Sequence, residues 1–103
     1  MDISEVIKEL NSRIKEKYTD FKGSYLYGSR ARGDYREDSD VDIVVIFDEV
    51  DRDKAMEAYG ICGEIDYKYD VVISLQLYTY PRLEINYVYH NEVVNKGIYF
   101  DAA

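Results

Sequence analysis

The sequence predicts an α/β or α+β domain, in which helices cover a small mixed sheet, from two observations. Apolar residues recur at helical spacing in the first and last parts of the chain. Between them, residues 41–47 read Val-Asp-Ile-Val-Val-Ile-Phe, a β-branched and aromatic run typical of a central strand. The 103 residues contain no linker-like stretch and no internal repeat, so we expect a single domain over residues 1–103.

The first helix is predicted over residues 3–17. Asp2-Ile3-Ser4-Glu5 matches a capping box, in which Asp2 caps the helix and Glu5 reaches back. The apolar positions that follow at helical spacing are Ile3, Val6, Ile7, Leu10 and Ile14. Tyrosines then alternate with other residues over 22–27, which predicts a strand that ends at Gly28.

A turn and a polar loop are predicted between this strand and the central one. Residues 28–34 form the turn, which opens a short helix, and residues 35–39 form the loop. After the central strand, Asp51 is the predicted N-cap of a helix that runs to about residue 65. Two internal glycines weaken this helix, each by about 1 kcal/mol relative to alanine.

The remaining residues are predicted as a strand, a connection and a helix. The third strand covers residues 67–75 and the connection covers residues 76–81. The last helix covers residues 82–95, and Gly97 is its expected C-terminal stop.

Charge and cysteine content restrict the class of protein. The net charge is −8, so the chain does not broadly neutralise phosphates, and we expect no direct nucleic-acid binding. The longest apolar run, residues 43–47, is far too short to span a bilayer, so we expect no membrane association. A basic partner protein, or bound metal ions, would offset this charge. Cys62 is the sole cysteine and cannot form an internal disulfide, which fits a reducing cytoplasm. The first residues are acidic and lack the regions of a signal peptide, which also favours a cytoplasmic protein.

The most informative segment is Gly28-Ser29, ten further residues, and then Asp40-Val41-Asp42. Because side chains alternate along a strand, Asp40 and Asp42 are expected on one face. Two such carboxylates can converge on an oxygen-preferring cation such as Mg²⁺, whereas without a cation they repel each other. The sequence therefore predicts a divalent-metal site at the start of the central strand.

The residues just before this pair are suited to phosphate. Gly28 permits a tight turn and a close approach of the backbone to a ligand. The N–H groups that follow it, together with the Ser29 hydroxyl, can donate to phosphate oxygens. Arg30 and Arg32 add positive charge with a bidentate geometry, so we expect both to bind the nucleotide.

A third carboxylate is expected from the third strand. Asp70 would share a face with Val72 and Ser74 and, if that strand lies beside the central one, would join the first two carboxylates. It could then bind metal or accept a proton from an attacking hydroxyl. Asp66 has the same parity and is the alternative; we favour Asp70 because it directly precedes the apolar run.

An EF-hand is a rival interpretation of the same acidic residues. Four carboxylates fall at loop positions one, three, five and twelve: Asp38, Asp40, Asp42 and Glu49. Position six, however, requires glycine, and Ile43 stands there. The loop would also consume the predicted central strand, so we reject this reading.

The motif Gly28-Ser29-Arg30-Ala31-Arg32-Gly33 followed by Ser39-Asp40-Val41-Asp42 resembles the minimal nucleotidyltransferases of the DNA polymerase β superfamily. The resemblance implies a reaction in which a hydroxyl attacks the α-phosphate of a nucleoside triphosphate and pyrophosphate leaves. It implies two Mg²⁺ ions, with Mn²⁺ as an alternative. By the same likeness Gly28 and Ser29 hold the triphosphate, Asp40 and Asp42 bind metal, and Asp70 is the third ligand or the base.

Minimal members of this superfamily are often encoded beside a HEPN-domain protein as a toxin–antitoxin pair. The resemblance implies that such an antitoxin transfers AMP from ATP to a tyrosine of the toxin and thereby silences its RNase activity. We expect the acceptor to lie in another protein, since no acceptor domain is evident. Two alternatives remain: a non-catalytic module that covers a basic partner, and a nucleotidyltransferase that modifies a small molecule. A small exposed sheet edge would favour pairing with another copy or another protein.

Overall fold

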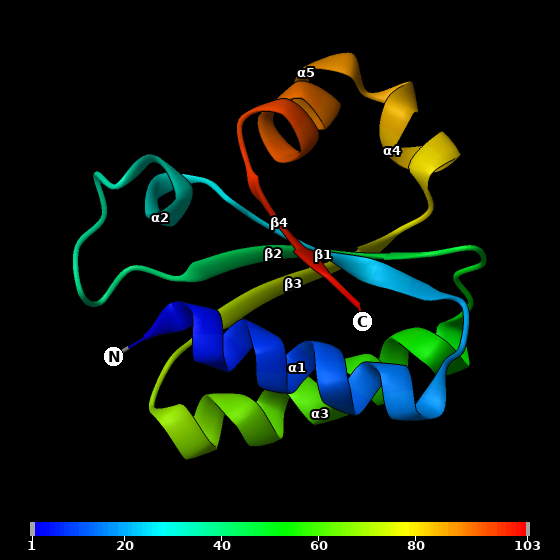
Figure 1. Cartoon of the computed structure of the whole chain (residues 1–103), viewed down its shortest axis with the longest axis horizontal. Helices are drawn as coiled ribbons and strands as arrows, with labels where there is room; N and C mark the ends of the chain where they lie inside the picture. Colours follow the sequence, from blue (N-terminus) through cyan, green and yellow to red (C-terminus); the bar gives the residue numbers. More distant parts are fainter. Residues whose placement is uncertain (1, 103) are drawn as a thin grey trace.

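The computed structural model describes residues 2–102, and its centre is a four-stranded mixed sheet with helices on both faces (Figure 1). The strand order is β3-β2-β1-β4. The central strand β2 is antiparallel to β1 and parallel to β3, and β4 is antiparallel to β1. The strand bounds are β1 Phe21–Tyr27, β2 Val41–Phe47, β3 Ile73–Tyr78 and β4 Ile98–Asp101. The predicted class, a small mixed sheet covered by helices, is confirmed.

Two long helices, α1 (Ile3–Lys17) and α3 (Arg52–Tyr69), lie side by side against one face of the sheet (Figure 1). The bounds of α1 are those predicted, and the Asp2 side chain caps it by accepting a hydrogen bond from the N–H of Ser4. The main core forms between these helices and the sheet, and includes Leu10, Ile14, Ile43, Val45 and Ile65.

The opposite face of the sheet carries three short helical segments: α4 (Tyr80–Ile85), α5 (Tyr87–His90) and the π-helix η1 (Asn91–Asn95). A second, smaller core forms here from Val44 and Ile46 of β2 together with residues of these segments, Leu83 and Val93. Asp42 precedes Val44 on the same face of the strand, because side chains alternate. The small helical layer therefore lies beside the predicted metal-binding carboxylate.

The predicted third strand over residues 67–75 is wrong in its first half. Helix α3 continues to Tyr69, and β3 begins only at Ile73. Gly60 and Gly63 do not end the helix, because its buried face packs against α1 and the sheet. Here tertiary packing outweighs intrinsic propensity. The predicted connection over residues 76–81 is also shortened, because β3 runs to Tyr78.

The predicted helix over residues 82–95 is broken. Asn86 is extended, with φ −98° and ψ 94°, and its side chain accepts a hydrogen bond from the N–H of Tyr89 at the start of α5. Gly97 follows the end of the helical segment as predicted, but the chain then enters β4, a strand that was not predicted. A Cβ at Gly97 would lie 2.1 Å from the carbonyl oxygen of Val93, so only glycine fits this passage.

Candidate active site

The backbone at Gly28 lies directly against the carboxylate of Asp42. Tyr27, the last residue of β1, is the register partner of Asp42 in β2, so Gly28 leaves the sheet beside that side chain. Gly28 has φ 76°, and a Cβ placed there would be 2.5 Å from Oδ2 of Asp42. Both the conformation and the close contact require glycine. The turn and the strand that carries Asp42 are thus joined at one point.

Helix α2 (Ser29–Arg32) begins immediately after this turn, as predicted. The N–H of Arg32 donates to the Gly28 carbonyl at 3.2 Å, and Gly33, with φ 84°, ends the helix. The first N–H groups of a helix have no intrahelical partner. In the described part of the chain no hydrogen bond occupies the N–H groups of residues 29–31. These donors are free for an anionic ligand next to Asp42.

The two carboxylates Asp40 and Asp42 repel each other. Burial raises the pKa of Asp42, the negative charge of Asp40 raises it further, and the guanidinium of Arg32 lowers it. Asp42 is half-buried, whereas Asp40 is exposed. A cation between them would relieve both the burial cost and the repulsion. Two carboxylates beside the Gly28 turn, where no side chain fits, are donors suited to Mg²⁺. They supply two protein ligands to such an ion.

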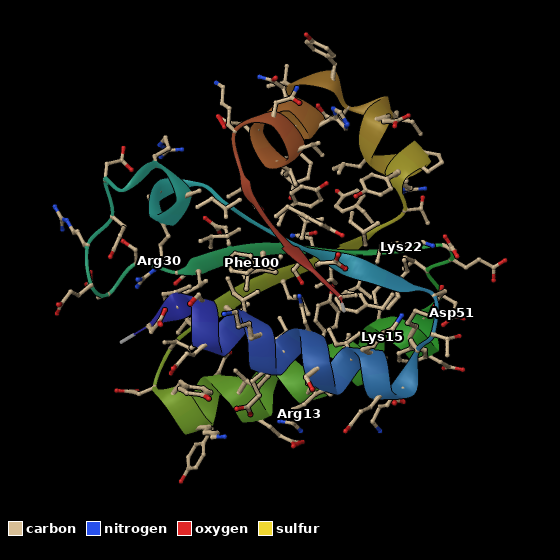
Figure 2. All side chains as sticks on the ribbon, in the orientation of Figure 1. Arg13, Lys15, Lys22, Arg30, Asp51 and Phe100 are labelled. Carbon is tan, nitrogen blue, oxygen red and sulfur yellow. The ribbon has the colours of Figure 1, made fainter. Side chains whose placement is uncertain are left out.

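Arg30 makes internal contacts that no sequence pattern predicts. Its Nη2 donates to the carbonyl oxygens of Glu37 at 3.0 Å and Ser39 at 2.9 Å, and its guanidinium lies 4.5 Å from the ring centroid of Tyr35. Figure 2 shows Arg30 beside the loop that joins α2 to β2. Arg30 therefore fixes the loop that delivers Asp40. Its expected contact with nucleotide stays a prediction.

Arg32 and Ser39 also have defined positions. Arg32 is exposed, its Nε lies 3.3 Å from a carboxylate oxygen of Asp34, and its charge acts on Asp42. This places a largely free guanidinium at the rim of the site, consistent with the predicted nucleotide contact. The Ser39 hydroxyl accepts a hydrogen bond from the N–H of Arg36 at 3.0 Å and so caps a turn.

The structure does not place Asp70 on a strand, which corrects the expectation from the sequence. Asp70 is the C-cap residue of α3, in the left-handed conformation with φ 54°, and its side chain is exposed. It lines a hollow of about 270 Å³ together with Arg30 and Glu37. Among residues 2–102 no three acidic, histidine or cysteine side chains gather into a metal-binding group. The role of Asp70 as third ligand or base thus stays a prediction.

Asp66, the alternative, lies on α3 near the start of β3. Its carboxylate accepts a hydrogen bond from the N–H of Ile73 at 3.0 Å. Burial raises the pKa of Asp66, that hydrogen bond lowers it, and the charge of Asp40 raises it. Asp66 is therefore electrostatically coupled to one of the two candidate metal ligands.

A group of tyrosines beside Asp42 was not recognised from the sequence. The Tyr89 hydroxyl donates to the Tyr27 hydroxyl at 2.9 Å, and the ring of Tyr89 also packs on Tyr78 at 5.7 Å between centroids. Burial raises the pKa of both Tyr27 and Tyr89, and the charge of Asp42 contributes. The alternating tyrosines of residues 22–27 predicted that Tyr27 lies on a strand. The contact with Tyr89 depends on the fold, which packs α5 against that strand.

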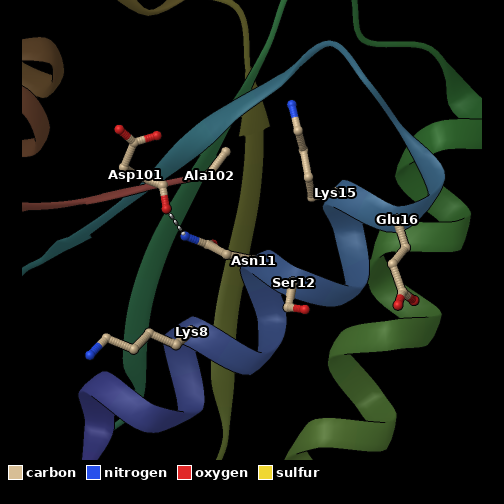
Figure 3. Close-up of a pocket in the computed structure, with 7 residues that line it drawn as sticks. All are labelled: Lys8, Asn11, Ser12, Lys15, Glu16, Asp101 and Ala102. Carbon is tan, nitrogen blue, oxygen red and sulfur yellow. Dashed lines mark hydrogen bonds between the residues drawn. The ribbon is translucent and has the colours of Figure 1, made fainter.

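A separate cavity of about 350 Å³ lies between α1 and the end of β4 (Figure 3). The Asn11 side chain donates there to the carbonyl oxygens of Phe100 and Asp101. None of the predicted site residues lines this cavity. In the part of the chain that the structure describes, no helix is both long and apolar enough to cross a bilayer.

The fold and the Gly28–Asp42 arrangement define a class of protein. Residues 7–98 match the family described as "Nucleotidyltransferase domain", and the chain belongs to this family. The chain is 36% identical over 100 residues to "Putative protein adenylyltransferase MJ0604" of Methanocaldococcus jannaschii, and the alignment covers 94% of this chain and 96% of that protein. It is 35% identical over 100 residues to "Putative protein adenylyltransferase MJ0141" of the same organism, which covers 95% and 98%.

Solved structures share the fold at lower identity. A crystal structure of a mutant of the toxin–antitoxin MntA-HpeT has a TM-score of 0.62 at 19% identity, covering 97% of this chain and 72% of that chain. A crystal structure of a toxin–antitoxin with AMP-PNP has a TM-score of 0.60 at 19% identity, covering 89% and 70%. At these identities the likeness establishes the fold and leaves activity and partner to other evidence.

Proposed function

We propose that this nucleotidyltransferase transfers AMP from ATP to a tyrosine hydroxyl of a partner protein. The observation that carries the proposal is the contact of Gly28 with Asp42, which sets free backbone donors beside a pair of repelling carboxylates. Phosphate and cation would then bind side by side, as nucleotidyl transfer requires. The names of the two archaeal relatives support a protein as the acceptor.

Each residue has a separate part in this mechanism. The N–H groups that follow Gly28, with the Ser29 hydroxyl, donate to the phosphate oxygens, and Arg32 adds positive charge at the rim. Asp40 and Asp42 would hold Mg²⁺ or Mn²⁺, and the bound metal would supply charge stabilisation at the phosphates. Arg30 fixes the loop and so holds Asp40 in position.

The chemical step is a substitution at the α-phosphorus. A bond forms between the tyrosine oxygen and this phosphorus, and the bond to the oxygen that bridges to the β-phosphate breaks. Pyrophosphate leaves, and the phenolic proton passes to a carboxylate, for which Asp70 is our first candidate and Asp66 the second. The products are AMP-tyrosine and pyrophosphate.

We further propose that the acceptor is a HEPN-domain toxin and that this chain acts as its antitoxin. The fold likeness to chains of two toxin–antitoxin structures supports this assignment. The net charge of −8 favours a second candidate function, in which the acidic surface neutralises a basic partner by covering it. If the partner is neutralised by catalysis, the Asp40→Asn, Asp42→Asn double variant should fail to protect cells. If it is neutralised by covering, the double variant should still protect them.

The test is incubation with Mg²⁺, ATP labelled at the α-phosphate, and the protein encoded by the adjacent gene. The wild-type chain should label that protein, and Asp42→Asn should not. Asp48→Asn is the matched control, because Asp48 is an exposed carboxylate just beyond the other end of β2. Labelling that persists in Asp42→Asn would rule out the proposed site. A double variant that forms a stable complex and still protects cells would favour neutralisation by binding.

A further inference from the structure

The outer edge of β3 has backbone groups without partners. In a parallel pair alternate residues direct both their N–H and C=O toward the same neighbour. The N–H of Val41 in β2 donates to the carbonyl of Val72, so residues 72, 74 and 76 point toward β2, and residues 73, 75 and 77 point away. The N–H of Ile73 is taken by Asp66. Within residues 2–102 no hydrogen bond reaches the backbone of Leu75 or Leu77 on the outer side.

This edge also lacks the features that protect edges in other proteins. Natural edge strands are commonly blocked by lysine, proline or a bulge. Residues 73–78 read Ile-Ser-Leu-Gln-Leu-Tyr, with no charge and no proline, and their pairing with β2 is regular. β3 packs mainly on β2 and α3, which leaves the outer side open. An extended segment of another chain could therefore continue the sheet.

The position of the edge relative to the site indicates what would bind there. Gly28 and the free N–H groups lie on the β1 side of Asp42, so the phosphates and the leaving pyrophosphate belong to that side. The attacking and leaving oxygens lie roughly in line in such transfers. The acceptor hydroxyl must then approach from the opposite side, which the strand order β3-β2-β1 makes the β3 side.

We propose that the acceptor tyrosine is delivered on an extended segment of the partner protein that adds as a strand to the outer edge of β3. This inference rests on the proposed function. Ser74 is the register partner of Asp42, so a residue added opposite Ser74 on the same face lies two strand spacings, about 10 Å, from Asp42. The small Ser74 side chain leaves space for an aromatic ring over β3. A tyrosine is long enough to cover much of this distance, whereas a serine hydroxyl stays close to its own strand.

Main-chain hydrogen bonds supply affinity in this mode of recognition, and the side chains on one face supply specificity. Leu77→Pro removes an outward N–H without removing a bond to β2, so an edge strand tolerates it. Leu77→Val is the matched control, because it keeps the N–H and an apolar side chain. Thermal unfolding of each variant verifies that it is folded.

The experiment combines two measurements with the adjacent gene product as acceptor. Labelling from ATP should fall at least tenfold in Leu77→Pro and stay near the wild-type rate in Leu77→Val. In the wild-type chain, the Leu75 and Leu77 amides should exchange hydrogen at least tenfold more slowly when the acceptor is present, while amides on the outer side of β4 should not change.

The outcomes separate this proposal from the proposed function. Normal labelling by a folded Leu77→Pro variant, with no added protection at Leu75, would overturn edge docking and leave the activity standing. If the Leu75 and Leu77 amides become protected from exchange as the concentration of this chain alone is raised, the edge binds a second copy. That result would also overturn edge docking of the acceptor. A wild-type chain that neither labels the acceptor nor gains edge protection would overturn both.

Discussion

Gly28 and Asp42 are in contact so close that no side chain fits between them: a Cβ on Gly28 would lie 2.5 Å from Oδ2 of Asp42. Gly33, six residues past the end of β1 in the same turn region, also has a positive φ, 84°, but a Cβ there would meet nothing within 4 Å. Substitution of Gly33 therefore tests backbone strain alone. Substitution of Gly28 tests backbone strain together with the steric clash at the Asp42 carboxylate.

We predict that Gly33→Ala costs about 1–2 kcal/mol of unfolding free energy, from the left-handed backbone alone, and keeps nucleotide transfer. Gly28→Ala should cost at least as much and abolish transfer, because its methyl group displaces the Asp42 carboxylate. Urea unfolding and the labelling assay measure the two quantities. Equal activity in both alanine variants would contradict the assigned role of the Gly28–Asp42 contact.

The stability of the metal-free protein should rise when Asp42 is replaced by asparagine. Because burial and Asp40 raise the pKa of Asp42 in the folded state, the ionised carboxylate destabilises the fold. This loss is absent at pH values below the unfolded pKa near 3.8, develops as pH rises from there to the folded pKa, and is complete above the folded pKa. At neutral pH with EDTA, Asp42→Asn should therefore melt above the wild type.

Addition of Mg²⁺ should reverse that order, because a ligand of the folded state stabilises it by mass action. The wild type should gain melting temperature with Mg²⁺ and ATP, and Asp42→Asn should gain little. The Asp48→Asn control should respond like the wild type. An equal gain in Asp42→Asn would show that the metal binds elsewhere.

Removal of the Arg30 side chain should loosen the loop between α2 and β2. Arg30→Ala loses two charge-assisted hydrogen bonds and should cost about 1.5–3 kcal/mol. Hydrogen exchange in residues 35–39 should accelerate, and labelling should fall with Asp40 displaced. Arg36→Ala removes an exposed arginine from the same loop and is the control. Unchanged exchange in Arg30→Ala would mean that the loop is held by other contacts.

Lys54 and Asp20 form a mostly buried ion pair at 2.7 Å that ties α3 to the start of β1. Burial raises the pKa of Asp20, but the hydrogen bonds from Lys54 and from the N–H of Glu49 outweigh it and leave the pKa lowered. The pair therefore stabilises the fold above the unfolded pKa near 3.8 and is lost as pH falls through the folded pKa.

Lys54→Met should consequently cost about 3–5 kcal/mol at neutral pH, because it leaves Asp20 as an unpaired, partly buried charge. The cost should shrink as pH is lowered toward 3. Equilibrium unfolding at several pH values measures this, and the exposed Lys17→Met is the control. A cost independent of pH would point instead to the lost cation–π contact between the Lys54 ammonium and the Phe47 ring.

Local sequence patterns correctly predicted the elements whose conformation depends on neighbouring residues. The turn at Gly28, the short helix after it and the strand that carries Asp42 are set by glycine, by alternation and by β-branched residues. The cap of α1 by Asp2 is equally local. These elements hold most of the candidate site, so the positions of the Gly28 turn and of Asp42 were predictable.

The remaining parts of the fold and of the candidate site depend on contacts between residues that are far apart in the sequence. Helix α3 passes through two glycines because its buried face packs on α1, and this moves Asp70 off the predicted strand. The hydrogen bond between Tyr27 and Tyr89 joins residues 62 apart. Strand β4 forms by pairing with β1. Ile98, Tyr99 and Phe100 are residue types that favour strands, but three such residues are too short a run to predict a strand without that pairing.

Transfer of AMP to a protein tyrosine is the activity proposed for this chain, and mass spectrometry of the acceptor detects it. After incubation with Mg²⁺ and ATP, the adjacent gene product should gain the mass of one AMP group, located by fragmentation on a tyrosine. The Asp40→Asn, Asp42→Asn double variant should leave it unmodified. An acceptor that stays unmodified with the wild-type chain, or is modified equally by the double variant, would contradict the account.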